Sequence, residues 1–182
     1  MLAASATGCI FPGAGTLLEK SLAEIRGSWG EAQEIQALPP GPILDRFRAV
    51  KVARVERSAD AGPLPGTLST VVETELRSAL KGANLFPGGP GPTLLIRARL
   101  TTHWPASVLA ATPSEIAARI EFLEEGRRAP LGIYYVRGLS TALARKSDVD
   151  LGRGLASGVI EVIESRRTPP PAPEPLAVRD TP

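Results

Sequence analysis

The sequence contains little of the chemistry that most active sites use. Among its 182 residues there is one cysteine, Cys9, and one histidine, His103. A single cysteine excludes an internal disulfide and a cysteine-based zinc site, and a single histidine removes most acid–base and metal-ligating arrangements. A catalyst built from this chain would have to rely on carboxylates, lysine, tyrosine or serine. We therefore expect a protein that is not an enzyme and binds no metal or cofactor.

Aromatic residues and excess charge are also scarce. Aromatics make up 4% of the chain, which argues against a stacking surface for bases or sugars. The 21 basic and 19 acidic residues leave a net charge of +2, so no field strong enough to indicate a nucleic-acid partner is expected. No apolar run approaches the ~20 residues that a membrane-spanning helix needs. Hydrophobic residues reach 43%, which is enough for a folded core.

Proline and glycine divide the chain into three parts. Residues 1–40 are expected to form a leader and tether, ending at the breaker-rich stretch 39–42. Residues 41–167 have the length and composition of one domain. Residues 168–182 contain six prolines and are expected to be an extended, disordered tail.

Hydrophobic periodicity predicts the elements of the middle part. A strand is expected near 48–56, with an irregularity close to Ala53. A helical stripe begins at Leu68 and is expected to stop at Gly82. Alternating residues predict three further strands, and Gly126 suits the turn of a hairpin between the last two. These strands lie near 94–101, 116–122 and 131–136, and a closing helix is expected over 148–165.

This order, β-α-β-β-β-α, predicts an α+β fold. The first two strands are joined by a helix and can lie parallel, while the others can form an antiparallel meander. Two amphipathic helices can cover only one face of a four-stranded mixed sheet. We therefore predict a two-layer sandwich with one solvent-exposed sheet face.

Four basic residues are predicted to lie on that exposed face: Lys51, Arg97, Arg99 and Arg119. They could contact an anionic partner such as a lipid head group or a glycan. They could equally form cross-strand pairs with acidic neighbours such as Glu121, and this reading is favoured because the acidic residues are interleaved.

Other polar positions have simpler structural interpretations. His103 lies where a strand ends, and the sequence indicates no carboxylate or nucleophile that would act with it in general-base catalysis. Asp148 and Asp150 resemble the start of a calcium loop, but the later ligand positions are missing. They are therefore expected to lie at the start of a helix, where their negative charges interact favourably with the positive end of the helix dipole. Gly152 and Gly154 could suit a phosphate, although close packing of a helix on the sheet is the better interpretation.

The segment Ala6-Thr7-Gly8-Cys9 has the form of a bacterial lipoprotein processing site, with small residues before a cysteine that becomes acylated. Only eight residues precede Cys9, without a basic start or an apolar run. We expect the complete signal to begin upstream of Met1. The alternative is an unmodified cysteine in a flexible terminus.

Together with the β-α-β-β-β-α order, this segment resembles small bacterial envelope lipoproteins, a group that includes transport-auxiliary and curli-secretion lipoproteins. The resemblance covers most of 41–167 in pattern, and only Cys9 matches as a motif. It implies anchoring by a lipid on Cys9 at the periplasmic face of the outer membrane, and contact with another envelope protein. The implied role is a binding or assembly component without cofactors. The alternatives are an oligomerising subunit of a secretion or transport complex, and a soluble binding domain without an anchor.

Overall fold

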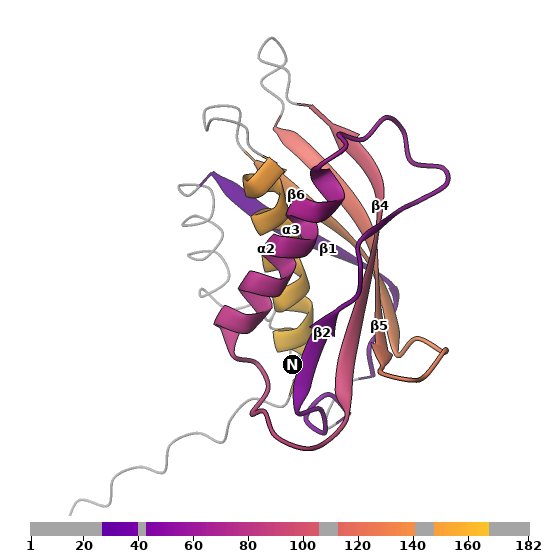
Figure 1. The fold of residues 1–182 in the computed structure, drawn as a ribbon, viewed down its shortest axis with the longest axis vertical. Coiled ribbons are helices and arrows are strands. Elements are labelled where there is room, and N and C mark those ends of the chain that lie inside the picture. The colour runs from indigo at the N-terminus through magenta and orange to yellow at the C-terminus, as the bar shows by residue number, and fades with distance from the viewer. Residues whose placement is uncertain (1–26, 40–42, 106–112, 141–147, 168–182) are drawn as a thin grey trace, which may run out of the picture.

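The computed structural model describes residues 27–39, 43–105, 113–140 and 148–167. Within these ranges the chain forms a sheet and two helices, which Figure 1 labels. The strands are β1 (Ser28–Gln36), β2 (Ala49–Val52), β3 (Glu56–Arg57), β4 (Thr93–Trp104), β5 (Ser114–Glu124) and β6 (Gly132–Ser140), and the helices are α2 (Leu68–Ala83) and α3 (Asp148–Arg166).

The predicted fold class is confirmed. Both helices lie on the same side of the sheet, so the molecule is an α+β sandwich of two layers (Figure 1). The sheet order is β1-β6-β5-β4-β2, and β3 pairs with β4 beyond the end of β2. As expected, β2 and β4 run parallel across their helical crossover, and β4, β5 and β6 form an antiparallel meander.

The sheet is larger than the predicted four strands. The additional strand β1 pairs antiparallel with β6 from Ser28 onward, so the folded unit begins well before residue 41 and includes part of the expected leader. Sequence alternation misses β1 because it is an edge strand that buries almost no side chain. Its residues from Glu31 to Gln36 are all exposed, and glycine or alanine occupies two of the positions that face the helices.

Most of the predicted strand interruptions, turns and helix ends agree with the structure. The irregularity expected near Ala53 is a true interruption, which separates β2 from β3. Gly126 adopts the left-handed conformation (φ 85°) in the hairpin between β5 and β6. The helix α2, however, continues past Gly82 and ends at Ala83, followed by the C-cap residue Asn84, whose φ of 47° lies in the left-handed region.

The core lies between the two layers. Alternate residues of β4 and β5 point into it and are fully buried, as their periodicity predicts: Leu94, Ile96, Ala98, Leu100, Ile116, Ala118, Ile120 and Phe122. The connection between β1 and β2 runs from one sheet edge to the other and buries Leu38, Leu44 and Phe47 completely. The backbone N–H of Leu38 donates to the hydroxyl of Tyr134 at 3.0 Å, which ties this connection to β6.

Glycines allow α3 to lie directly against the backbone of β1 and β6. A Cβ placed on Gly30 would come within 2.3 Å of the carbonyl oxygen of Gly154 and 2.4 Å of the amide nitrogen of Gly158. On Gly138 it would come within 2.4 Å of the carbonyl oxygen of Leu151. A Cβ on Gly154 of α3 would come within 2.5 Å of the carbonyl oxygen of Trp29, so this glycine packs against the sheet as expected. Gly152 instead faces α2, where a Cβ would come within 3.1 Å of the Glu75 side chain.

Candidate functional site

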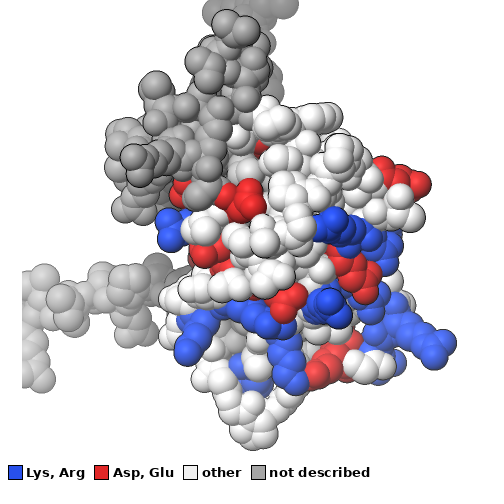
Figure 2. All heavy atoms as spheres, turned by 45° about the horizontal axis from the view of Figure 1, so that its top comes forward, with Lys and Arg blue, Asp and Glu red and all other residues white. Residues whose placement is uncertain are grey.

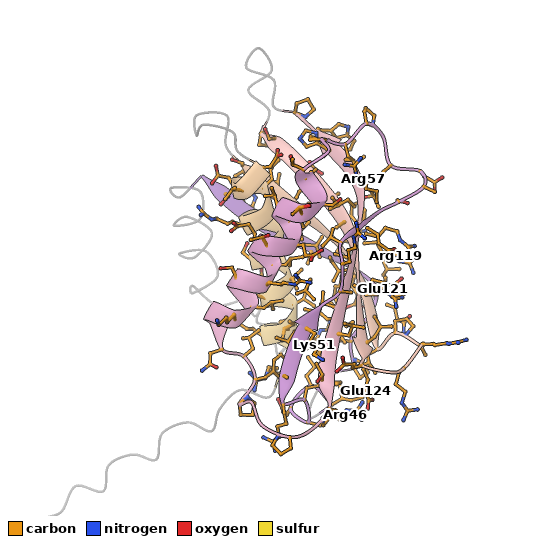
Figure 3. The ribbon with its side chains drawn as sticks, in the orientation of Figure 1. Arg46, Lys51, Arg57, Arg119, Glu121 and Glu124 are labelled. Atoms are coloured by element: carbon orange, nitrogen blue, oxygen red, sulfur yellow. The ribbon has the colours of Figure 1, made fainter. Side chains whose placement is uncertain are left out.

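The four predicted basic residues lie on the sheet face that the helices do not cover. Arg119 and Glu121 project from this side in Figure 3, and the strand register places Arg97 opposite Glu121 and Lys51 opposite Leu95 on the same face. The face is less exposed than expected, because Leu123 and Leu139 are buried on it beside the charged side chains.

Each of these four residues has a carboxylate partner. The Nζ atom of Lys51 lies 2.7 Å from an oxygen of Glu125, and Arg99 lies 3.4 Å from Glu56. A carboxylate oxygen of Glu121 lies 3.3 Å from a guanidinium nitrogen of Arg97, and the other lies 3.2 Å from one of Arg119. An anionic ligand on this face would therefore have to compete with these carboxylates for the basic side chains. Figure 2 shows Lys and Arg side chains interleaved with Asp and Glu side chains on the side in view.

The pairing between Lys51 and Glu125 affects ionisation. The hydrogen bond from the Lys51 ammonium lowers the pKa of the Glu125 carboxyl below its usual value, and the nearby positive charge acts in the same direction. The carboxylate therefore remains charged to lower pH than an isolated glutamate. At neutral pH the charged Glu125 carboxylate therefore remains in its ion pair with Lys51.

A second charge cluster on this face was not predicted from the sequence. The guanidinium of Arg137 donates two hydrogen bonds to Glu115, at 2.6 Å and 2.5 Å, and it lies 3.2 Å from Glu31. Glu115 is almost fully buried, and its hydrogen bonds are the main cause of a raised pKa for Arg137. Because these residues come from β1, β5 and β6, the cluster joins three strands and has the character of a structural clamp.

The two edges of the sheet differ. At the β2–β3 edge, the backbone N–H of Val55 donates to Glu73 at 2.9 Å, and Arg77 donates to the carbonyl oxygen of Val52 at 3.2 Å. Glu73 and Arg77 also form an ion pair with each other, at 2.8 Å. Side chains of α2 therefore occupy hydrogen-bonding groups that another strand would otherwise use.

The opposite edge is β1, a strand of nine residues. It pairs with β6 on one side, and within the described residues it has no strand neighbour on the other. Ile35, at a register shift near its end, is 60% exposed and is one of the two large exposed hydrophobic residues of the described chain. An exposed strand with an apolar residue at its edge is a common template for pairing with another chain.

Two grooves lie beside α2 on the β2–β3 side. The β3–α2 groove has a volume of about 440 Å³ and is lined by Arg54, Val55, Glu56, Arg57, Gly66, Ser69, Thr70 and Glu73. The β2–α2 groove has a volume of about 480 Å³ and is lined by Val50, Lys51, Val52, Arg77, Leu80 and Lys81. The Glu73–Arg77 ion pair contributes one residue to each groove.

The remaining candidates take the following positions. Cys9 lies outside the described residues. His103 is a partly buried residue of β4 opposite Ile116. Asp148 and Asp150 occupy the first turn of α3, where carboxylates interact favourably with the positive end of the helix dipole. The described residues contain no group of three or more histidine, cysteine, aspartate or glutamate side chains suited to a metal ion.

Comparisons with known proteins concern the fold alone. No family profile and no curated sequence matches this chain. Among solved structures, a variant of the PelC dodecamer from Paraburkholderia phytofirmans shares 9% identity and a TM-score of 0.42, covering 74% of this chain and 96% of that chain. The PelC dodecamer from the same organism in another crystal form shares 9% identity and a TM-score of 0.41, covering 78% and 99%.

Neither helix in the described part of the chain combines the length and apolar character needed to cross a membrane.

Proposed function

We propose that this chain is a non-catalytic component of a bacterial cell envelope, held at a membrane by a lipid on Cys9, that binds or assembles with another envelope protein. The anchor is supported by the segment Ala6-Thr7-Gly8-Cys9. An acyl chain raises the local concentration of the domain at the membrane, so even a modest contact surface can bind its partner there.

The observation that carries the proposed contact is the difference between the two sheet edges. Glu73 and Arg77 occupy backbone groups at the β2–β3 edge, whereas β1 is long, exposed and without a described outer neighbour. The charged sheet face supports the contact less well, because its basic residues are already paired with carboxylates. We therefore assign the contact to β1, by addition of a partner strand.

Photo-crosslinking in cells tests this assignment. A photoreactive amino acid at Ile35 should capture a partner, and the same group at Trp104 provides a matched control because the two side chains are similarly exposed, at 60% and 57%. Equal capture from both positions, or none from Ile35, would contradict the proposed edge. If the captured species is a second copy of this chain, the oligomerising alternative is the correct one.

The anchor is tested separately by mass spectrometry of the mature protein. We expect an acylated amino-terminal Cys9 and a protein that sediments with membranes, and Cys9→Ser should release it into the soluble fraction. An unmodified Cys9 thiol in soluble full-length protein would leave a binding domain without an anchor.

A further inference from the structure

The β2–α2 groove has an unusual division of its lining residues. Val52 and Leu80 are 9% and 3% exposed, and with Val50 they form an apolar floor that continues into the core. The other three lining residues, Lys51, Arg77 and Lys81, are all cationic, and no carboxylate is among the six. Its volume of about 480 Å³ falls in the range of small-molecule sites, ~300–1,000 Å³.

The three cations are not equally available. Lys51 is engaged by Glu125, and Arg77 is engaged by Glu73 and the carbonyl oxygen of Val52. Lys81 is exposed and forms no ion pair within the described part of the chain. An anionic group entering the groove would therefore meet Lys81 as its first free partner, with Arg77 one helical turn away.

The structure also argues against an extended peptide as the occupant. A peptide that added along the β2–β3 edge would need backbone groups that are already used, because the carbonyl oxygen of Val52 accepts from Arg77 and the N–H of Val55, between the two strands, donates to Glu73. What remains is an apolar floor with a cationic rim. This combination is complementary to a molecule that carries one anionic group on an apolar chain.

We propose that the β2–α2 groove binds a single-chain anionic amphiphile, whose alkyl chain lies on Val50, Val52 and Leu80 and whose phosphate or carboxylate head contacts Lys81. This site involves neither Cys9 nor the β1 edge. Its test is consequently independent of the anchor and of the partner contact proposed above.

Isothermal titration calorimetry on the full, unacylated chain tests the ligand class. Dodecyl phosphate and dodecanoate, each below its critical micelle concentration, are the probes; dodecyl maltoside supplies a chain without charge, and inorganic phosphate a charge without a chain. At least one anionic amphiphile should bind tighter than both controls. Binding of one and not the other identifies the head group. Equal affinity for dodecyl maltoside, or for inorganic phosphate, overturns the proposal.

A pair of variants locates the site. Lys81→Gln should weaken binding of the better amphiphile roughly 3- to 10-fold, the effect expected for losing one partly exposed charged contact. Arg128→Gln removes a charge that is likewise exposed, from the β5–β6 connection outside the groove, and should leave the affinity unchanged. Equal effects of the two substitutions, with both variants folded by circular dichroism, would show nonspecific charge attraction and refute the site.

Discussion

Replacing Gly30 by alanine should destabilise the domain, although strand propensity alone predicts the opposite. Glycine inside a strand costs ~0.5–1 kcal/mol relative to alanine, so the substitution would be favourable if the site were open. The structure shows that it is closed. The added methyl group would meet backbone atoms of α3, at 2.3 Å from the carbonyl oxygen of Gly154 and 2.4 Å from the amide nitrogen of Gly158.

The size of the effect follows from this geometry. Ordinary contact for a Cβ begins near 3.4 Å, so α3 and β1 must separate by about 1 Å to relieve the 2.3 Å approach. A radial gap of that size removes roughly a quarter to a half of the dispersion energy of the contacts it opens. Overpacking of this kind typically costs ~1–3 kcal/mol, which corresponds to a fall in Tm of roughly 2–12 °C for a domain of this size.

Thermal unfolding followed by circular dichroism measures the effect, and Gly82→Ala provides the control. Gly82 lies in the last turn of α2, and a Cβ there meets nothing within 4 Å. Alanine is the better helix former by ~1 kcal/mol, so this variant should keep or raise the Tm. The reasoning fails if Gly30→Ala unfolds at the same temperature as the parent, or at a higher one.

Two further predictions concern a buried hydrogen bond and a charge pair. Tyr134→Phe leaves the buried N–H of Leu38 without its acceptor and should cost ~1–3 kcal/mol, seen as a lower urea midpoint with an unchanged m-value; an unchanged midpoint would mean that another acceptor replaces the hydroxyl. In an NMR pH titration, Lys51→Met should raise the pKa of Glu125 towards the ordinary glutamate value, and no change would show that the lysine does not cause the shift. Because the folded-state pKa is lowered, the stability from this pair is present above the unfolded pKa and is lost as pH falls through the folded value.

The sequence predicted those parts of the fold in which side-chain burial repeats regularly. Strands β4 and β5 were recognised because every second residue, such as Ile96 and Ile120, enters the core. Strand β1 was missed because its residues 31–36 are all exposed, so its position depends on backbone pairing with β6 and on the contact between Gly30 and α3. Contacts made by backbone atoms leave little periodic signal in a sequence.

The charged face shows the same limit at the level of the site. Alternation was sufficient to place Arg97, Arg99 and Arg119 on one face, and it also suggested Glu121 as a partner. The partners of the other cations depend on strand register, which the composition of a strand does not specify. Glu115 and Arg137 meet for this reason, and their clamp was found only from the structure.

The helix α2 affects both strand addition at the β2–β3 edge and ligand binding in the β2–α2 groove. Glu73 and Arg77, one turn apart on α2, occupy the backbone groups of the edge and so disfavour addition of a strand there. Lys81 follows after one more turn, at the rim of the β2–α2 groove and above its apolar floor. Because Arg77 serves both the closed edge and the groove, its substitution would change both properties together. Lys81 contributes to the groove alone, and it is therefore the position at which ligand binding and edge protection can be separated.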